Sequence, residues 1–470
     1  MSERIPVQLI QTFDPPQTKI KSRTTDNLIH TRSFTGLFRT LRISGAGVLF
    51  LLFFGTVWLN WGDRQAVLWD LSASKFHIFG ATFWPQDFIL LSALLIIAAF
   101  GLFAITVFAG RVWCGYTCPQ SSWTWIFMWV EKITEGERNQ RIKLQAAPWG
   151  LAKLLRRSAK HTLWLAISLL TGLTFVGYFT PIRPLAEELL TLQIGGVSLF
   201  WVLFFTGATY LNAGWLREAV CMHMCPYARF QSVMFDKDTL TISYDVARGE
   251  IRGPRKREVN PADIGLGDCI DCQMCVQVCP TGIDIRDGLQ MECIGCAACI
   301  DACDSIMDKM GYARGLIKYT SERQLQGGKT HLLRPRLIGY TAVLLVMIGA
   351  LAVALVQRPM VSLDVSKDRG LFRENSQGQI ENIYSLKIIN KTQQRQAYQL
   401  SLVNGDGFVL QGKTQLTLAP GEIIDVPVSV AMLSERPRSG SQEMTFKVAD
   451  SDEPDIYSEA KSRFVAPMNR

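Results

Sequence analysis

Five long apolar segments divide this chain of 470 residues. They run over residues 41–61, 88–109, 163–182, 194–211 and 337–356, and charged residues fall only at their ends. A helix needs roughly 20 apolar residues to cross a bilayer core of about 30 Å. The pattern therefore predicts a polytopic α-helical membrane protein with about five spans, four of them in a membrane domain at 41–235 and the fifth at 337–356.

A different pattern follows the fifth span. Between residues 361 and 470, short runs at 384–388, 398–402 and 424–430 alternate apolar and polar side chains, as half-buried strands do. Turns rich in Gly, Asn and Pro separate these runs. Regular short strands of this kind predict an all-β, immunoglobulin-like sandwich of about 100 residues. No catalytic constellation is visible in it, so both a docking role and a purely structural one stay open.

Lysine and arginine are unevenly distributed among the loops. The tail before the first span has seven, the 111–160 loop nine and the 217–336 loop sixteen, whereas the two remaining loops have three together. Basic loops are retained on the cytoplasmic side of a membrane. This bias predicts a cytoplasmic N-terminus and an external C-terminal domain. It also accounts for the net charge of +8, so no nucleic acid partner is needed to explain that charge.

The segment before the first span is a polar tail. Residues 1–40 include Pro6, Pro15 and Pro16 among Thr, Gln and Lys, a composition that predicts a largely disordered cytoplasmic tail. No small-residue cleavage pattern follows the first span, which is therefore expected to be a retained anchor rather than a signal peptide. A basic run at 252–257 is expected either to rest on anionic headgroups or to be a solvated linker.

Eight of the twelve cysteines form two matched runs. Each has the x2, x2, x3 spacing that wraps a cubane iron–sulfur cluster in thiolates, and in two-cluster ferredoxins the fourth cysteine of each run serves the other cluster. A zinc site would need only four ligands and gives no reason for two such runs. The spacing predicts a two-cluster ferredoxin-like α+β insert at 236–330, with one 4Fe-4S cluster on Cys269, Cys272, Cys275 and Cys303, and the second on Cys293, Cys296, Cys299 and Cys279.

The other four cysteines form two Cys-x3-Cys-Pro elements, Cys114 to Cys118 and Cys221 to Cys225. Cysteines four apart lie on one face of a helix, so their sulfurs can converge on one ion, and soft thiolates select Cu(I) or iron–sulfur clusters. The second pair encloses three more potential ligands, Met222, His223 and Met224. Either a copper site or a third cluster on four thiolates is expected, and two pairs of purely structural cysteines are the alternative.

Haem is a weaker expectation, because a buried haem needs histidines deep within the spans. The chain has five histidines, and all of them lie in loops or at span ends: His30, His77, His161, His223 and His331.

These features together resemble the cytochrome c oxidase accessory protein family CcoG, also called FixG or RdxA. The residues that carry the resemblance are Cys114-Gly-Tyr-Thr-Cys118-Pro119, Cys221-Met-His-Met-Cys225-Pro226 and the eight-cysteine insert. The resemblance implies a bacterial inner-membrane protein that reduces Cu(II) to Cu(I) for assembly of cbb3-type cytochrome c oxidase. It implies Cys114, Cys118, Cys221 and Cys225 as the copper-handling residues.

The partners expected on this hypothesis are a cytoplasmic electron donor, copper ions, copper chaperones or cbb3-type oxidase subunits, and the lipid bilayer. The sequence leaves open whether the membrane cysteines act within one chain or across a homodimer.

Two alternatives of other classes remain. One is a quinol dehydrogenase subunit that feeds electrons to a periplasmic reductase. The other is a non-enzymatic scaffold for oxidase assembly that uses its clusters as sensors.

Overall fold

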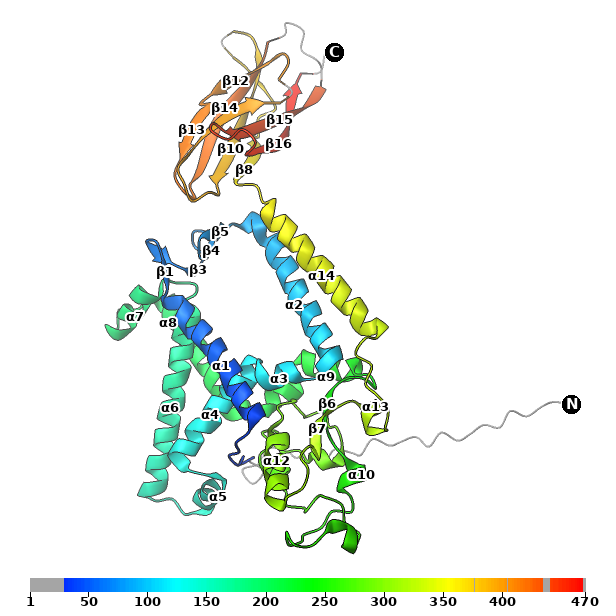
Figure 1. Cartoon of the computed structure of the whole chain (residues 1–470). Coiled ribbons are helices and arrows are strands. Elements are labelled where there is room, and N and C mark those ends of the chain that lie inside the picture. Colours follow the sequence, from blue (N-terminus) through cyan, green and yellow to red (C-terminus); the bar gives the residue numbers. More distant parts are fainter. Residues whose placement is uncertain (1–28, 376, 404, 434–439, 468–470) are drawn as a thin grey trace, which may run out of the picture. The chain divides into compact units, whose positions relative to one another are not determined.

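The computed structural model describes residues 29–375, 377–403, 405–433 and 440–467 (Figure 1). Most of the tail predicted to be disordered lies outside these residues. The chain divides into two compact units, each assembled from three separate stretches. Unit 1 comprises Met1–Gly45, Ala109–Trp164 and Asn212–Thr330, and unit 2 comprises Ala46–Phe108, Leu165–Leu211 and His331–Arg470. Each unit is described by itself below.

Five helical segments are long and apolar enough to cross a membrane, which confirms the prediction of about five spans. They extend over Leu37–Trp58, Pro85–Ala109, Leu151–Val176, Gly196–Leu216 and Pro335–Val356. The third begins well before the apolar pattern does. Lys153 and Lys160 lie in its N-terminal part, and both are buried. Lys153 donates to the carbonyl oxygen of Gln145, and Lys160 pairs with Glu135 at 2.8 Å.

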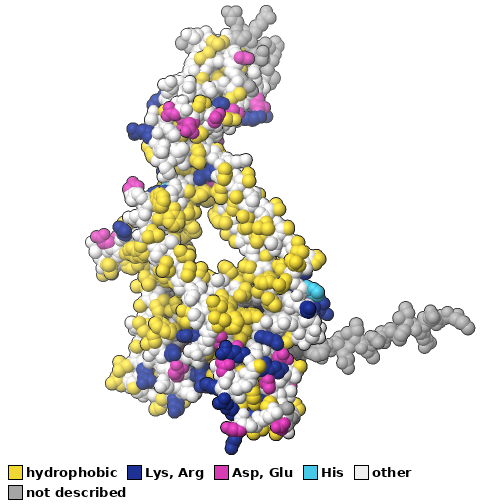
Figure 2. Space-filling model, viewed as in Figure 1, with side chains coloured by type: hydrophobic (Ala, Val, Ile, Leu, Met, Phe, Trp, Pro, Cys, Tyr) yellow, Lys and Arg dark blue, Asp and Glu magenta, His cyan; other side chains and the backbone are white. Residues whose placement is uncertain are grey.

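The spans correspond to helices α1 (Leu37–Gly55), η2 (Thr56–Trp58), η3 (Pro85–Asp87), α2 (Phe88–Ala109), α6 (Leu151–Val176), α8 (Gly196–Thr209), the π-helical η4 (Tyr210–Leu216) and α14 (Pro335–Val356). Most of the side chains in the apolar stretches of these helices are not covered by other parts of the protein. In the most apolar 18 residues of α14, none is buried. Figure 2 shows these hydrophobic side chains gathered over the helices. Helices that are apolar all round and face no protein are expected to face lipid.

Unit 2 contains two small sheets between the first and second spans, which the hydrophobic pattern did not reveal. One pairs β1 (Asn60–Trp61) with β2 (Arg64–Gln65), and the other has the order β3 (Val67–Asp70), β4 (Lys75–Ile78), β5 (Ala81–Phe83). The short helix α7 (Ile182–Leu190) belongs to the same unit. These strands are only two to four residues long, too short for a period-two pattern to stand out.

The C-terminal part of unit 2 is a sandwich of two antiparallel sheets, as predicted (Figure 1). Its buried core contains Tyr384, Tyr398 and Phe446, and the rings of Tyr384 and Phe446 lie 4.9 Å apart in an edge-on contact. One sheet has the order β12 (Phe408–Gly412), β14 (Ile423–Met432), β10 (Ile380–Asn390), β8 (Val361–Lys367), with β9 (Arg373–Glu374) on β10; the other has the order β13 (Gln415–Leu418), β11 (Gln396–Leu402), β15 (Gly440–Asp450), β16 (Tyr457–Ala466).

Unit 1 contains short helices around the membrane cysteines and the ferredoxin-like part. Two of the helices, α4 and α9, begin at the proline of a Cys-x3-Cys-Pro element, where the missing N–H costs no hydrogen bond. The helices are α3 (Val112–Tyr116), α4 (Pro119–Glu135), α5 (Arg138–Ala146), the π-helical η5 (Val220–Met224) and α9 (Pro226–Met234).

The buried carboxylate of Glu131 links these helices through ion pairs. Glu131 on α4 forms one ion pair with Arg141 on α5 at 3.0 Å and another with Arg217 at 2.5 Å. All three side chains are at most 5% exposed. Burial alone would raise the pKa of Glu131, but the two guanidinium groups outweigh burial and hold that pKa below its usual value. Glu131 is therefore ionised and serves as the junction of α4, α5 and the segment after the fourth span.

The ferredoxin-like part has the predicted α+β character. Strand β6 (Thr241–Tyr244) pairs antiparallel with β7 (Ile317–Thr320), and helix α12 (Ala298–Met310) packs beside them through Ile300 and Met307. The remaining elements are α10 (Val246–Gly249), η6 (Pro261–Ile264), α11 (Met274–Gln277), η7 (Ile285–Asp287) and α13 (Glu322–Leu325). This frame holds the two cysteine runs on loops that lead into α11 and α12.

Candidate metal centres

Two small cavities in the ferredoxin-like part are lined by cysteines, each about 20 Å³ in volume. The first is lined by Cys269, Cys272, Cys275 and Cys303. The second is lined by Cys279, Cys293, Cys296 and Cys299, and also by Cys275. The fourth cysteine of each run thus lies at the cavity of the other run, in the arrangement that the crossed assignment requires. Which sulfur binds iron stays a prediction.

The two runs share one backbone geometry, which explains how each loop turns three sulfurs toward one cavity. The residues on either side of the second cysteine have positive φ in both runs: Asp271 (51°) and Gln273 (54°) in the first, Gly295 (66°) and Ala297 (57°) in the second. A left-handed residue reverses the chain sharply, and for a residue with a Cβ this conformation is uncommon. The repetition at matched positions indicates that both loops are shaped around a bound group.

The buried thiols suit an iron–sulfur cluster. Burial raises the pKa of Cys275, Cys293 and Cys303 to about 12 each, so these sulfurs would stay protonated without a cation beside them. Bound iron would replace those protons and stabilise the thiolates. Within the described residues, no three His, Cys, Asp or Glu side chains are close enough to hold one metal ion. A cubane is larger than a single ion, so its thiolate ligands lie further apart.

The four membrane cysteines form a second group in unit 1. Cys114 lies on α3, Cys118 directly precedes α4, Cys221 lies on η5 and Cys225 directly precedes α9. Burial raises the pKa of Cys114 to about 12 and that of Cys221 to about 11, and Cys118 contributes to both shifts through its charge. The two Cys-x3-Cys-Pro elements are therefore neighbours in space, as a shared site requires.

Gln231 on α9 supports this group and was missed by the sequence reasoning. Its side chain is fully buried, and the Sγ atom of Cys114 lies 3.6 Å from its Oε1 atom. Its Nε2 atom has no hydrogen-bond partner. Because amide oxygen and nitrogen positions can be exchanged by a flip, the same side chain can donate an N–H to a thiolate at Cys114.

The three additional ligand candidates of the second pair are less favourably placed. Met222 is half-buried, whereas His223 and Met224 are exposed, Met224 to 65%. Their assignment as copper ligands stays a prediction.

The membrane cysteines lie against the second ferredoxin cavity. A Cβ atom on Gly115 would come within 2.8 Å of both the Cα atom of Cys296 and the carbonyl oxygen of Gly295. Arg111, the N-cap residue of α3, donates to the carbonyl oxygens of Cys293 at 3.2 Å and Ala228 at 2.7 Å. The first Cys-x3-Cys-Pro element is thus in backbone contact with the loop that lines the second cavity.

A tyrosine reinforces the same junction. The hydroxyl group of Tyr319 on β7 donates to the carbonyl oxygen of Gly295 at 2.6 Å. Neither Arg111, Gly115 nor Tyr319 was singled out from the sequence. The sequence could have drawn attention only to Gly115, which lies inside a Cys-x3-Cys-Pro element, and to Arg111, which stands three residues before that element.

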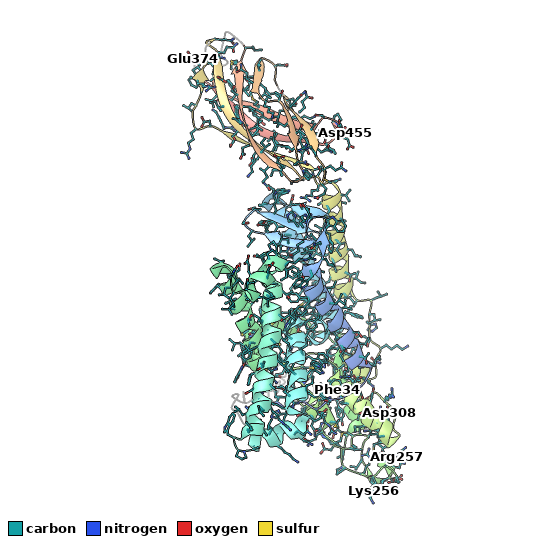
Figure 3. The ribbon with its side chains drawn as sticks, turned by 90° about the vertical axis from the view of Figure 1, so that its left-hand side faces the viewer. Phe34, Lys256, Arg257, Asp308, Glu374 and Asp455 are labelled. Carbon is teal, nitrogen blue, oxygen red and sulfur yellow. The ribbon has the colours of Figure 1, made fainter. Side chains whose placement is uncertain are left out.

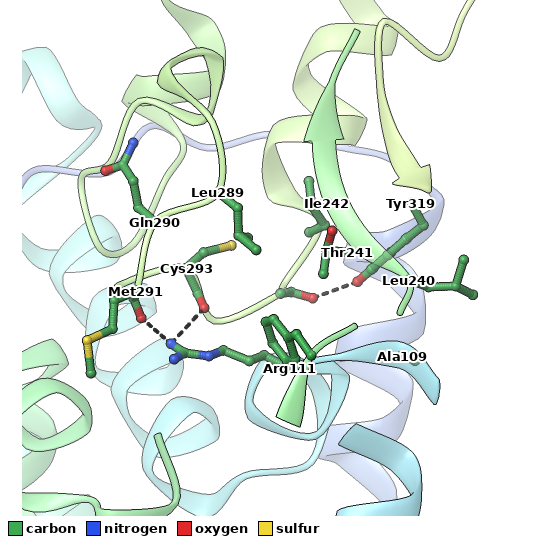
Figure 4. Close-up of a pocket in the computed structure, with 12 residues that line it drawn as sticks. Ala109, Arg111, Leu240, Thr241, Ile242, Leu289, Gln290, Met291, Cys293 and Tyr319 are labelled. Atoms are coloured by element: carbon green, nitrogen blue, oxygen red, sulfur yellow. Dashed lines mark hydrogen bonds between the residues drawn. The ribbon is translucent and has the colours of Figure 1, made fainter. Parts of the chain in front are cut away.

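A cavity of about 180 Å³ lies beside this junction (Figure 4). Leu240, Leu289 and Met291 give it apolar walls, and it extends from Ala109, the last residue of the second span, to Cys293. Figure 4 shows the Arg111 guanidinium at its edge, hydrogen-bonded to the backbone of Met291 and Cys293. A small apolar molecule bound there would lie next to a thiol of the second cavity.

Two families described as 4Fe-4S domains match segments that contain the two groups of cysteines. A 4Fe-4S dicluster domain matches residues 216–322, which contain Cys221, Cys225 and the eight ferredoxin cysteines. A 4Fe-4S binding domain matches residues 91–132, which contain Cys114 and Cys118. The family described as an IG-like fold at the C-terminal of FixG matches residues 351–467.

Similar whole proteins include three from bacteria. Protein RdxB of Cereibacter sphaeroides is 40% identical over 85% of this chain and 86% of its own length, and Protein RdxA of the same organism is 41% identical over 81% and 83%. Nitrogen fixation protein FixG of Rhizobium meliloti is 35% identical over 78% of this chain and 77% of its own. A crystal structure of a FixG-related protein from Vibrio parahaemolyticus aligns with 23% of this chain and 95% of its own, at 30% identity and a TM-score of 0.21.

These similarities cover the spans, the cysteine runs and the sandwich together. The prediction from the sequence motifs is confirmed: the chain belongs to the FixG/RdxA family and is a membrane iron–sulfur electron-transfer protein.

Proposed function

We propose that this protein reduces Cu(II) to Cu(I) and so supports assembly of cbb3-type cytochrome c oxidase. The observation that carries the proposal is the backbone contact between Gly115, in the first Cys-x3-Cys-Pro element, and Cys296, in the second ferredoxin run. An electron acceptor held by the membrane cysteines would lie close to the ferredoxin-like part. The charge distribution supports placing both on the cytoplasmic side, with the sandwich outside.

The chemistry of the residues suits a one-electron reduction. A bound iron–sulfur cluster supplies single electrons. Its reduction potential is set by hydrogen bonds to the sulfur atoms and by the solvent exposure of the cluster. No three of the thiol groups of Cys114, Cys118, Cys221 and Cys225 lie close enough to hold one ion in this structure, so they would have to draw together around copper. Thiolates bind Cu(I) more strongly than the harder Cu(II), and this preference favours the reduction. Arg111 holds the two sites together through its hydrogen bonds and places a positive charge near Cys114, which stabilises a thiolate there.

The membrane cysteines have an alternative occupant. The 4Fe-4S binding domain match over residues 91–132 favours a third cluster on the four thiols. Copper would then be reduced beside this cluster rather than on the cysteines themselves. Copper counts in the purified protein distinguish these two versions, because only the first holds copper on the four thiols.

The test uses full-length protein, purified without oxygen and reduced with dithionite that is then removed. Cu(II) is added together with a chelator that absorbs light only when it binds Cu(I), and the yield per chain is measured. We expect about one Cu(I) ion to form for each electron stored in the reduced iron–sulfur clusters. Replacing Cys114 and Cys118 with Ser should abolish most of this yield, whereas Thr117→Ser, between them, should leave it unchanged. An undiminished yield in the double variant would overturn the site assignment.

A second candidate function, quinol dehydrogenase, is favoured by the cavity beside Cys293. This cavity begins at the end of a membrane span and is mainly apolar, as a site for a quinol ring would be. In membranes, addition of quinol alone should then bleach the iron–sulfur absorbance. Bleaching by quinol together with an absence of Cu(I) formation would favour this function over copper reduction.

A further inference from the structure

A second cavity in unit 1, of about 120 Å³, is lined by five basic side chains and no acidic one. It lies among the segment before the first span, helices α4 and α5, and the loop after the first cysteine run. The basic residues are Arg32, Arg39, Arg42, Lys132 and Arg141. Cations gathered around so small a space repel one another, and an anion bound among them would relieve this repulsion.

Few of these charges are neutralised by the protein itself. Lys132 pairs with Glu137 at 2.9 Å, and Arg141 pairs with Glu131 at 3.0 Å. Arg32, Arg39 and Arg42 have no ion-pair partner within the described stretches of the chain. The cavity therefore carries an uncompensated positive charge of about three, taken from these three arginines.

Two of the guanidinium groups also have buried N–H groups without a hydrogen bond. Arg141 is 4% exposed, and its Nε atom has no partner. The Nε atom of Arg42 is likewise buried and without a partner, while its guanidinium lies 5.9 Å from the ring centres of both Phe34 and Trp125. A buried donor without an acceptor is costly, so these groups indicate a missing acceptor in the cavity.

The cavity also lies at the N-terminal end of a helical segment that is long and apolar enough to cross a membrane. Arg39 and Arg42 are on the first turns of the span Leu37–Trp58, and Trp125 and Trp129 on α4 line the cavity as well. Tryptophan and arginine at the end of a span are typical of the headgroup region of a bilayer. We propose that this cavity binds the phosphate headgroup of an anionic phospholipid, with the acyl chains running along the first span.

A headgroup bound here would touch the electron-transfer part of the protein. The cavity is lined by Val278 and Pro280, the two neighbours of Cys279, which itself lines the second cysteine cavity. The lipid would therefore hold the N-terminal end of the first span against the loop that contributes this cysteine. Loss of the lipid is expected to loosen that contact without removing any cysteine.

The proposal is tested on full-length protein exchanged into detergent containing equal amounts of phosphatidylglycerol and phosphatidylcholine. Native mass spectrometry then counts the lipids that remain bound. We expect retention of phosphatidylglycerol over phosphatidylcholine. Each basic residue near an anionic headgroup changes binding by about five-fold, so the double variant Arg39→Gln, Arg42→Gln should lower the retained fraction at least about five-fold.

The matched control removes two basic residues elsewhere in unit 1. Lys256 and Arg257 are exposed, and Figure 3 shows both projecting from the ferredoxin-like part, away from Phe34 at the cavity. The variant Lys256→Gln, Arg257→Gln should retain as much phosphatidylglycerol as the unmodified protein. If the double arginine variant fails to fold, as judged by its iron content, Ser33→Asp is used instead. Ser33 is exposed at the cavity, and a carboxylate there should repel the headgroup.

Three outcomes would overturn the proposal. The arginine variant, or Ser33→Asp in its place, could retain phosphatidylglycerol as well as the unmodified protein does. The control could lose as much lipid as the arginine variant, which would make the effect one of total charge. Inorganic phosphate at the same concentration could displace the lipid fully, which would make the cavity a site for free anions. None of these outcomes bears on copper reduction, which is measured separately.

Discussion

The backbone of Gly115 lies directly against that of Cys296, so that a Cβ atom on Gly115 would come within 2.8 Å of the Cys296 Cα atom. Distances this short do not occur between a real Cβ atom and its neighbours. Only glycine at position 115 allows the first Cys-x3-Cys-Pro element and the second ferredoxin run to approach this closely. The contact joins the two groups of cysteines that the proposed electron transfer connects.

Replacing Gly115 with alanine should separate these two backbones. We expect the rate of Cu(II) reduction to fall by about ten- to a hundred-fold, because small displacements of reacting groups have effects of this size. Iron content should not change, because no ligand is removed. Gly47→Ala on α1 is the control, since a Cβ atom there meets nothing within 4 Å. Equal rates for the two variants would contradict the importance of the contact.

Arg111→Gln should weaken the same junction by another route. The substitution removes charged hydrogen bonds to the carbonyl oxygens of Cys293 and Ala228. Such bonds each contribute about 1.5–3 kcal/mol. We expect a free energy of unfolding lower by about 3–6 kcal/mol for the two bonds together, measured by urea denaturation in detergent. Arg183→Gln, at an exposed position, should have no measurable effect.

If the fourth cysteine of each run binds the cluster of the other run, single cysteine variants should fall into pairs that affect the same cluster. Cys279 belongs to the first run but lines the cavity of the second, and Cys303 shows the reverse. In electron paramagnetic resonance spectra, Cys279→Ser should therefore change the same signal as Cys293→Ser. Cys303→Ser should change the same signal as Cys272→Ser. Pairing of Cys279 with Cys272 instead would show that each run serves one cluster by itself.

The ionisation of Glu131 should make the stability of the protein depend on pH. Its pKa is lowered in the folded protein by Arg217 and Arg141, against the effect of burial, so its carboxylate stabilises the fold above the pKa that it has when unfolded. This contribution should be lost as the pH falls through the folded pKa. Glu131→Gln should lower the free energy of unfolding at neutral pH by about 3–5 kcal/mol, because it leaves two buried arginines without their partner.

The difference in the free energy of unfolding between Glu131→Gln and the unmodified protein should then become smaller at acid pH. Urea denaturation at a series of pH values measures it. Glu443→Gln is a suitable control, because the ion pair of Glu443 with Lys461 lies on the exposed surface of the sandwich. Pairs this exposed contribute little to stability, because water screens them. A constant difference for Glu131→Gln across the acid range would contradict the role assigned to its charge.

The sequence predicted those parts of the structure that depend on local pattern. Spans, alternating strands and cysteine spacing are each written within a few tens of residues, and all three predictions of element type hold. The cavity around Arg42, Trp125 and Arg141 depends on three distant segments, so no local pattern reveals it. The same is true of Gly115 and Cys296, whose approach is decided by how separate loops pack rather than by either loop alone.

The most direct test of this account is an iron and acid-labile sulfide count on full-length protein purified without oxygen. Two clusters in the two cysteine cavities predict about eight iron and eight sulfide per chain, and a third cluster on the membrane cysteines predicts about twelve of each. Copper is measured in the same sample. A colourless protein without sulfide, or one that holds zinc in place of iron, would contradict the central claim that these cysteines bind iron–sulfur clusters.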